Sequence, residues 1–372
     1  MNFEFSKDQL ILRDGIRRFV DERYSFESRR QRVKSKSTGT DRAMWAQIAE
    51  LGWLAVLIPE EHGGLGWSIA DACVMFQELG RGLVSEPIMD SALLAVRILT
   101  RADSVSARLL LPKIATGEVF ISVALGEAGL RYEQKGLSTR AIPIEGGYKL
   151  TGKKILVAGG DVADRLIVSA GTDSELALFD VLAISDGVER RAYRLLDGQW
   201  AVDVTFKDVV LPHESLIIGS QTTEILDRAI DEAALGCSAE AIGCMDRVLE
   251  ITAEYLRSRQ QFGRALADFQ VLQHRIADLF IETEMARSAF HSALSAIDSP
   301  VATRQAAVSA ARVRIDQAAH KVGNQGVHLH GGMGMAMEYP IGHYYRRLIM
   351  LARAYGDTEH HLERYERLKI RA

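Results

Sequence analysis

Apolar residues recur at helical spacing through the first 118 positions of the chain. Ser6 with Gln9 three residues later is a capping-box pattern, and Ile16 follows on the apolar face of the same predicted helix. A second predicted helix carries Trp45, and a third covers ADACVMFQELGRGL, after the glycine-rich loop PEEHGGLGWS. The pattern therefore predicts an N-terminal helical domain over residues 1–118.

Short runs of β-forming residues replace this spacing between positions 119 and 215. The runs are FISVAL, YKLTG, KILVA, DRLIVSA, ALFDVLAI and WAVDVTF. Gly-Gly, Thr-Asp and Asp-Gly turn signals separate them, as in consecutive strands of a sheet. We therefore predict a compact β domain over residues 119–215.

Long, Ala-rich helical patterns return after this β domain. They span roughly 222–259, 267–297, 301–326 and 341–369, and glycines and prolines separate them. Four long helices with short connections predict a bundle over residues 216–372. The order helical, β, helical predicts an α+β fold. It disfavours a doubly wound nucleotide-binding fold, in which strands and helices alternate from the start.

Composition and charge narrow the class of protein. The 372 residues are 47% hydrophobic and 25% charged, with a formal net charge of -4, so we expect a folded globular protein without a nucleic-acid or membrane partner. The start, MNFEFSKDQL, lacks the apolar stretch of a signal peptide, which favours a cytoplasmic location. The three cysteines form no C-x-x-C pair and are interpreted as core residues.

Two long strings connect this pattern to a known family. RSRQQFGRALADFQVLQHRIAD at 257–278 and HLHGGMGMAMEYPIGHYYRRL at 328–348 resemble the two signatures of the acyl-CoA dehydrogenases. GWLAVLIPEEHGGLGWS, and G-x-K-x-x-V-A-G-G-x-x-A-D at 152–164, resemble that family as well, so the resemblance covers essentially the whole chain. It implies an N-terminal helical domain, a central β-barrel and a C-terminal four-helix bundle. The implied reaction is FAD-dependent α,β-dehydrogenation of an acyl-CoA thioester, with an electron-transfer flavoprotein as electron acceptor.

The resemblance also implies which residues contact FAD. Four positions match family residues that reach the cofactor across a subunit interface: Arg259, Gln261, Phe262 and Gln270. The guanidinium of Arg259 suits the pyrophosphate because of its fork geometry. A second group matches residues near the diphosphate and adenosine: His328, Gly331 and Gly332. The alternatives are a solvated helix face for the polar residues and a plain interhelix turn for the glycines.

A metal site is not expected, although His328 and His330 stand two residues apart before the glycine pair. Nothing nearby in the sequence supplies a further His, Cys or carboxylate at ligand spacing. His328 falls where the family has a FAD-contacting Gln, so the resemblance implies a hydrogen-bonding role for this side chain.

The reaction requires a carboxylate that removes the α proton of the substrate. Without gaps, the two family positions for this base fall on Tyr355 and Ala233, and neither residue is an acid. Glu232 and Asp357 stand beside these positions and are the candidate bases. One helix residue corresponds to a rotation of about 100°, so Glu232 needs a local shift to face the same site. The alternative for both is a solvated or helix-capping acid.

The β domain departs from the family in its substrate loop. Family members present a T-E-P-x-x-G-S-D-like loop there, whereas this chain has GEAGLRYE, with Gly126 at the Thr position and Arg131 in place of Ser. The string KKILVAGG departs as well, which weakens the case for a flavin held by this chain's own β domain. Arg131 is a candidate contact for a CoA phosphate or a distal substrate carboxylate, and the alternative is a structural surface arginine.

The closing pattern GGMGM…EY…IGHY…GD…HH resembles the small subunits of hetero-oligomeric members, such as those that act on pimeloyl-CoA. That resemblance implies a homologous large subunit and a medium-chain dicarboxylyl-CoA substrate. A homo-oligomer and a steroid side-chain thioester stay open. A second hypothesis is a catalytically degenerate structural subunit, which the loss of both base positions favours. A flavin monooxygenase or a nitroalkane oxidase on the same fold is disfavoured by the small-subunit pattern.

Overall fold

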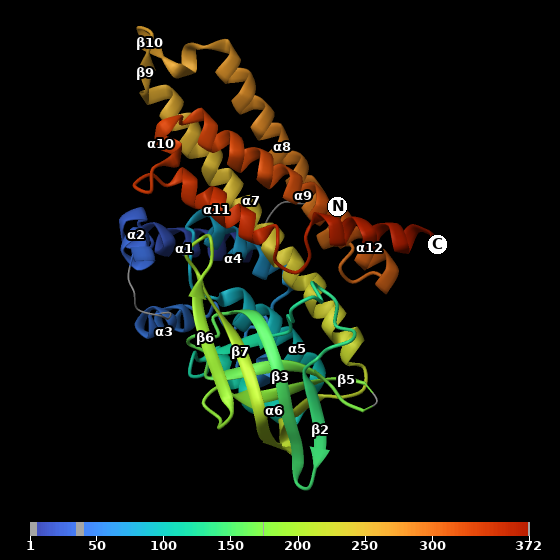
Figure 1. The fold of residues 1–372 in the computed structure, drawn as a ribbon. Coiled ribbons are helices and arrows are strands. Elements are labelled where there is room, and N and C mark those ends of the chain that lie inside the picture. Colours follow the sequence, from blue (N-terminus) through green and yellow to red (C-terminus); the bar gives the residue numbers. More distant parts are fainter. Residues whose placement is uncertain (1–5, 35–40, 174, 371–372) are drawn as a thin grey trace. The chain divides into compact units, whose positions relative to one another are not determined.

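The chain forms two units, each assembled from separate stretches of sequence (Figure 1). The helical unit comprises Met1–Ser35, Cys73–Val84 and Ala234–Ala372, and the sheet unit comprises Lys36–Ala72 and Ser85–Ala233. This computed structural model describes residues 6–34, 41–173 and 175–370, so the first residues of MNFEFSKDQL lie outside the described part. The division into three domains at residues 118 and 215 stays a prediction from the sequence.

The helical unit begins with the predicted capping box. The Ser6 hydroxyl accepts a hydrogen bond from the Gln9 backbone N–H, and the Gln9 side chain accepts one from the Ser6 backbone N–H. These bonds satisfy donors that the first turn of a helix otherwise leaves unpaired. The N-terminal helices are α1 (Lys7–Arg23) and α2 (Phe26–Lys34), followed after a gap in sequence by α4 (Ile69–Arg81).

The C-terminal part of the chain is helical, as predicted. Its long helices are α7 (Thr222–Ser258), α8 (Gln270–Ser295) and α9 (Val301–Leu329). The short elements are β9 (Gln260–Gln261), β10 (Arg264–Ala265), η4 (Leu266–Asp268) and α10 (Gly332–Met335). The last two helices are α11 (Ile341–Leu351) and α12 (Thr358–Ile370). The helices α4 and α7 each contribute residues to both units.

The single helix predicted over residues 341–369 is wrong. The structure ends α11 at Leu351 and begins α12 at Thr358, with a turn over residues 352–357 between them. Tyr355 has a φ of 56° and Gly356 a φ of 115°. Both values lie outside the right-handed helical region, so the helix cannot continue through this turn.

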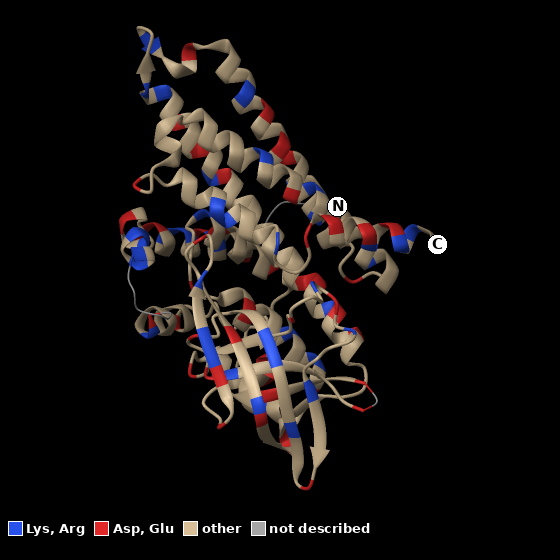
Figure 2. Cartoon of the chain, viewed as in Figure 1, with Lys and Arg blue, Asp and Glu red and all other residues tan. Residues whose placement is uncertain are grey.

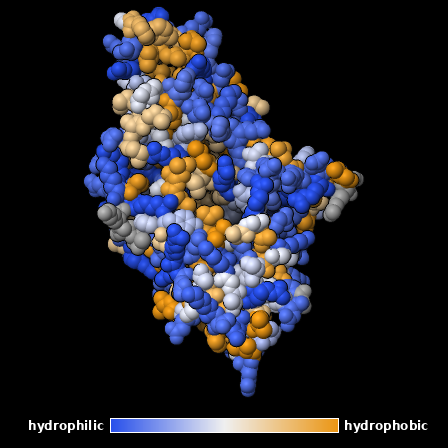
Figure 3. Space-filling model, viewed as in Figure 1, coloured by the Kyte–Doolittle hydropathy of each residue, from blue (hydrophilic) through white to orange (hydrophobic). Residues whose placement is uncertain are grey.

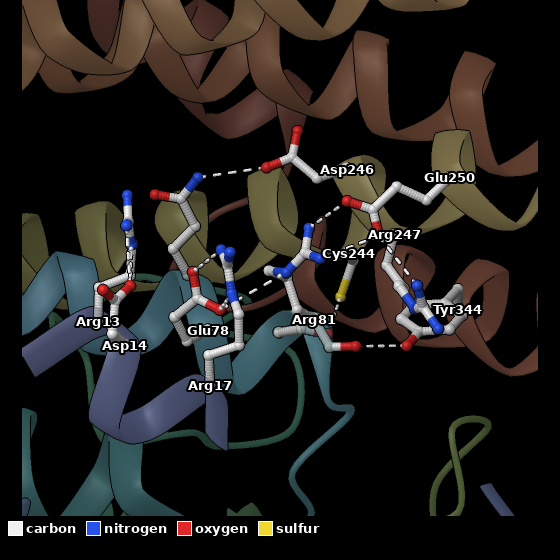
Figure 4. A network of polar contacts seen from close by, with 12 residues as sticks. Arg13, Asp14, Arg17, Glu78, Arg81, Cys244, Asp246, Arg247, Glu250 and Tyr344 are labelled. Carbon is white, nitrogen blue, oxygen red and sulfur yellow. Dashed lines mark hydrogen bonds and ion pairs between the residues drawn. The ribbon is translucent and has the colours of Figure 1, made fainter. Parts of the chain in front are cut away.

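Two glycines allow α4 and α7 to cross closely within the helical unit. A Cβ at Gly80 would lie 2.2 Å from the carbonyl oxygen of Glu240, and one at Gly243 would lie 1.8 Å from that of Gln77. A polar network surrounds this crossing (Figure 4). In it, Arg17 forms two hydrogen bonds to the carboxylate of Glu78, which is 3% exposed. The crossing is therefore fixed by close backbone approach and by an ion pair to the buried Glu78.

The sheet unit contains an eight-stranded sheet in the order β6-β7-β3-β2-β4-β5-β8, with β1 paired parallel to β4. Its strands are β1 (Ile121–Ala124), β2 (Arg140–Ile144), β3 (Gly147–Ala158), β4 (Arg165–Gly171), β5 (Leu176–Leu182), β6 (Val188–Arg194), β7 (Trp200–Pro212) and β8 (Leu216–Ile218). The predicted fold class, with helical parts before and after a central sheet, is confirmed.

Helices and short turns complete the sheet unit. They are α3 (Arg42–Glu50), η1 (Glu60–His62), the π-helical η2 (Met89–Ala95), α5 (Val96–Ala102), α6 (Val105–Ala115) and η3 (His213–Ser215). Trp45 of α3 is buried, and its ring centroid lies 4.4 Å from that of Phe120, next to β1. The core of this unit therefore includes the contact between α3 and the start of the sheet.

Two separately predicted runs, YKLTG and KILVA, form one strand, β3. Its pairing with β7 shifts register between Lys154 and Val157, which leaves Leu156 in a bulge with a φ of 58° and its side chain 59% exposed. The strands β2 and β6 were not predicted, because RAIPI contains a proline and VERRAYR is mostly polar.

Candidate functional site

The residues predicted to contact FAD across an interface lie at one end of the helical unit, around the hairpin of β9 and β10 (Figure 1). Arg259, Gln261, Phe262 and Gln270 are all exposed. Phe262 has a φ of 55°, and 88% of its surface is exposed. A strained backbone that presents a large apolar ring to solvent is unusual in a monomer, and such features gather at binding sites.

The side chain of Arg259 is available for an anion. Its backbone N–H donates to the carbonyl of Tyr255, and its own carbonyl accepts from the N–H of Leu266, so the main chain at this position is fixed. Within the described ranges, no carboxylate pairs with the Arg259 guanidinium. An exposed and unpaired guanidinium on a fixed backbone suits a pyrophosphate.

His328, Gly331 and Gly332 lie at the C-terminal end of α9 and the turn that follows it. His328 is exposed, and its Nδ1 lies 3.2 Å from Nη1 of Arg275 on α8. A Cβ built at either glycine would meet no atom within 4 Å, so the backbone is open to a close approach. These residues and Arg259 therefore fit the diphosphate and adenosine half of FAD.

His330 is buried, in contrast to the exposed His328. It is 2% exposed, its Nδ1 lies 2.7 Å from the carbonyl of Gly326, and its ring lies 4.4 Å from that of Tyr255. Among the residues that the structure describes, no three His, Cys, Asp or Glu side chains gather as a metal ion would require.

Glu232, the first candidate base, lies in the sheet unit near the N-terminal end of α7. Its side chain is fully buried, and three guanidiniums hold it. Arg97 Nε donates at 2.6 Å, Arg101 Nη2 at 2.7 Å and Arg228 Nε at 2.8 Å. We refer to these four residues as the Glu232 cluster. The neighbouring Ala233, at the family's base position, is also fully buried.

The electrostatics of the Glu232 cluster oppose general-base chemistry. Burial alone would raise the pKa of Glu232, but the hydrogen bonds and charges of Arg97 and Arg101 outweigh it and lower that pKa to about 2. A general base acts best with a pKa near the working pH. Glu232 is therefore a permanently ionised partner of the arginines and a poor proton acceptor.

Asp357, the second candidate base, lies in the helical unit at the end of the turn over residues 352–357. Its Oδ1 accepts a hydrogen bond from the backbone N–H of His360 at 2.9 Å, and its carbonyl accepts one from that of His361 at 3.0 Å. This is the position of an N-cap for α12. The contacts match the helix-capping alternative, and the family's base position beside it holds the half-buried Tyr355.

Arg131 is exposed on a turn of the sheet unit, with a φ of 47°. A buried ion pair fixes the loop that carries it, because Lys154 Nζ donates to Glu127 at 2.7 Å. Burial lowers the pKa of Lys154 to about 8. The hydrogen bonds of Lys154, Ser138 and Thr139 outweigh the burial of Glu127 and lower the pKa of that carboxyl to about 2. Arg131 is thus an exposed side chain on an anchored loop.

The sequence interpretation missed most of the Glu232 cluster. Arg228 and Glu232 stand four residues apart on one helix, so that pair was visible in the sequence. Arg97 and Arg101 also stand four residues apart, but more than 130 residues separate Arg97 from Glu232. No local pattern indicates such a contact.

Charges of both signs are distributed over the two units (Figure 2).

Within the described residues, no helix is both long and apolar enough to cross a membrane.

Comparisons with known proteins decide the family. The sequence model "Acyl-CoA dehydrogenase, N-terminal domain" matches residues 6–118, and "Acyl-CoA dehydrogenase, C-terminal domain" matches residues 223–368. The chain belongs to the acyl-CoA dehydrogenase family. Members of this family are FAD-dependent oxidoreductases that act on acyl-CoA thioesters, so the predicted enzyme class and cofactor are confirmed.

Individual relatives cover most or all of this acyl-CoA dehydrogenase chain. The acyl-CoA dehydrogenase IpdE2 of Mycobacterium tuberculosis is 31% identical over 83% of this chain and 81% of its own length. Among solved structures, the ChsE4-ChsE5 complex from Mycobacterium tuberculosis contains a chain that is 27% identical, with a TM-score of 0.90 and full coverage of both chains. A variant of the Tcur3481-Tcur3483 steroid ACAD is 28% identical, with a TM-score of 0.88 and 98% coverage of both chains.

Proposed function

We propose that this acyl-CoA dehydrogenase works as one subunit of a hetero-oligomer, in which a homologous larger chain supplies the catalytic carboxylate. One observation carries the proposal: neither base position of this chain holds an available acid. Glu232 is bound by three arginines, and Asp357 caps α12. Because general-base catalysis contributes about 100- to 10,000-fold, an efficient enzyme needs the base from elsewhere.

This chain contributes a cofactor surface in the proposed assembly. Arg259 and Gln270 bind FAD that is held mainly by the neighbouring subunit, and the backbone at Gly331 and Gly332 lies against its diphosphate half. Bound FAD supplies the acceptor for the hydride that leaves the substrate's β carbon. An electron-transfer flavoprotein then reoxidises the enzyme. The exposed and unpaired state of Arg259 supports this arrangement, since a guanidinium that served its own subunit's core would be paired.

Exposed apolar side chains on α8 support the presence of a partner chain. Val271, Phe280, Ile281 and Met285 each expose between 53% and 59% of their surface. Figure 3 shows apolar atoms at the end of the helical unit where β9 and β10 lie. Large exposed apolar side chains are typical of protein interfaces, and Ile281 and Met285, four residues apart, share one side of the helix. The ChsE4-ChsE5 neighbour is itself a complex of two named chains, which supports a partner that differs from this chain.

The substrate that we propose is a medium-chain dicarboxylyl-CoA such as pimeloyl-CoA, with Arg131 as a contact for its distal carboxylate or for a CoA phosphate. The exposure of Arg131 and the anchored loop beneath it support this role. A polycyclic acyl-CoA is the competing substrate, because one of the similar structures is a steroid ACAD. Turnover of pimeloyl-CoA and of a steroid side-chain thioester by the same preparation decides between them.

A structural subunit without chemistry of its own is the second candidate, and the ion pairs that occupy Glu232 favour it. The two functions differ in their dependence on Arg259. If this chain contacts FAD, Arg259→Ala in the assembled protein lowers its flavin content. If the chain is only structural, flavin content and turnover stay at wild-type values.

The test of the proposed function compares the purified chain with the same chain assembled with its homologous larger partner. Acyl-CoA-dependent dye reduction is measured for both preparations at equal flavin concentration. We expect turnover by the pair and at most about 1% of that rate from the lone chain. Equal rates would contradict the proposal.

A further inference from the structure

A buried side chain, Arg312 of α9, contacts the turn over residues 352–357, and the buried His361 also contacts the backbone of Tyr355. Arg312 is fully buried in the helical unit. Its Nη2 donates to three backbone carbonyls around the turn: Leu351 at 2.9 Å, Ala354 at 3.2 Å and Gly356 at 3.3 Å. These acceptors span the end of α11 and the turn itself. A single nitrogen therefore gathers the carbonyls of a segment that has no regular secondary structure.

The turn needs such support because its backbone is strained. Tyr355 is a non-glycine residue with a φ of 56°, and Gly356 has a φ of 115°. A Cβ at Gly356 would lie 2.5 Å from Nε2 of His361, so the turn also packs tightly onto α12. Conformations of this kind persist only where the surrounding structure imposes them.

The guanidinium of Arg312 has unpaired hydrogen-bond donors, although the side chain is buried. Its Nε and Nη1 have no hydrogen-bond partner among the described residues. Asp316, one helical turn away, has an oxygen 3.4 Å from Nη2, which is longer than a good hydrogen bond. Unpaired buried donors offset part of the stabilisation that the hydrogen bonds of Nη2 contribute, so the hydrogen bonds to the turn are the contacts that this side chain is placed to make. What it does achieve is the placement of the turn.

Several charged groups face Arg312 and Asp316. Asp316 is 5% exposed and neighbours Arg312, Asp357 and Thr358. On α12, the buried His361 lies beside Arg312, His360 and Arg364. Burial, followed by the positive charges around it, lowers the pKa of His361 to about 2, so this imidazole stays neutral. Arg312 is thus the cation that the turn is built around.

We propose that Arg312, backed by Asp316, is a positioning residue that holds the turn over residues 352–357 in its left-handed conformation and thereby sets where Tyr355 and Asp357 lie at the reaction site. The functional half of this proposal rests on the proposed function, because the sequence resemblance places the turn at the family's base and flavin-contact positions. The structural half concerns this chain alone.

The experiment compares Arg312→Met with Arg312→Lys and with a control, Arg314→Met. Arg314 lies on the same helix, but its ion pair is with Glu282 of α8. Hydrogen–deuterium exchange of the full chain reports on the turn without flavin or substrate. We expect exchange over residues 351–358 to rise about tenfold or more in Arg312→Met, to recover partly in Arg312→Lys and to stay unchanged in Arg314→Met.

The same variants in the assembled flavoprotein test the reaction. The turn holds no reacting group in the proposed function, but the sequence resemblance places it at a flavin contact, and misplacement of a reactant by about 1 Å can cost about 100-fold. We therefore expect acyl-CoA-dependent flavin reduction to slow at least about tenfold in Arg312→Met, with a smaller change in the KM for the acyl-CoA. Gly356→Ala distorts the turn directly and should reproduce both effects, even if Arg312→Met does not fold.

The outcomes separate the two ideas. Unchanged exchange at residues 351–358 in both Arg312→Met and Gly356→Ala overturns the positioning role. Faster exchange with a rate of flavin reduction within twofold of wild type overturns its link to the reaction. If the wild-type pair oxidises no acyl-CoA, the proposed function fails, while the exchange data still decide whether Arg312 holds the turn.

Discussion

The Glu232 cluster in the sheet unit and the pair of Arg312 and Asp316 in the helical unit both bury charge, but they satisfy that charge differently. Glu232 accepts hydrogen bonds from three arginines, and its pKa is lowered to about 2. Arg312 keeps two unpaired nitrogens, and burial, partly offset by Arg312, raises the pKa of Asp316 to about 7. The first cluster pairs its buried charge, whereas the second leaves buried donors unpaired beside a strained turn.

In the proposed function, the chain lacks an acid at both base positions that the family resemblance predicts. Ala233 stands at the first, beside a glutamate bound by three arginines. Tyr355 stands at the second, near an aspartate that caps a helix. Both sites keep a carboxylate close by, but its role in each is structural.

The largest effect is expected from Glu232→Gln. Removing the carboxylate charge leaves three largely buried guanidiniums without their counter-ion, which costs about 3–5 kcal/mol of unfolding free energy. Urea denaturation at pH 7 measures this loss. As a control, Glu284→Gln removes a more exposed partner of Arg287 and should cost less than about 1 kcal/mol. A similar, small cost for both variants would mean that the Glu232 cluster is not a stabilising unit.

Asp316→Asn should change the pH dependence of stability in the opposite direction to Glu232. Because the folded pKa of Asp316, about 7, lies above its ordinary value of 3.8, the folded state binds the proton more tightly. The stability that Asp316 contributes is fully present below pH 4. The free energy of unfolding then falls by about 1.4 kcal/mol per pH unit as the pH rises to about 7. Glu232 contributes above its ordinary value of 4.5 and loses its contribution as the pH falls toward 2.

Urea denaturation between pH 4 and pH 8 tests this slope. Asp316→Asn should flatten the fall in stability over that range and be more stable than wild type at pH 8. Asp14→Asn, at a more exposed carboxylate, serves as the control. Parallel curves for wild type and Asp316→Asn would show that Asp316 does not titrate near neutral pH.

A smaller effect is expected from Arg259→Ala, at the exposed end of the helical unit. A charge-assisted contact with the FAD pyrophosphate is worth about 1.5–3 kcal/mol, so its loss should weaken FAD binding by the assembled enzyme about tenfold or more. Unfolding of the lone chain should not change. Arg257→Ala, two residues earlier and also exposed, is the control. Equal FAD retention by Arg259→Ala and wild type during dialysis would remove Arg259 from the cofactor surface.

The sequence allowed the fold class and most helices to be predicted, because their signals are local. The capping box at Ser6 and the long Ala-rich patterns needed no knowledge of distant contacts. The range predicted for the last helix ran through the break at Tyr355 and Gly356, although Gly356 and Asp357 are residues typical of turns. The polar strand β6 was missed because it pairs along an edge and lacks an apolar alternation.

The candidate site was only partly predictable, for a related reason. Arg259 and Gly331 belong to contiguous motifs, so the resemblance identified them. The electrostatic state of Glu232 depends on Arg97 and Arg101, which reach it from α5, and the position of Asp357 depends on Arg312 of α9. Contacts between residues so distant in sequence are a property of the folded chain.

The most direct test of the central claim is the rate of flavin reduction by acyl-CoA in the assembled enzyme carrying Asp357→Asn. Asparagine caps a helix about as well as aspartate, so this change removes the acid and preserves the fold. Glu232→Gln is measured beside it under conditions where the variant is folded. We predict rates within about threefold of wild type for both variants. A loss of 100-fold or more in either variant, with the fold intact, would place the catalytic base in this chain and contradict the account.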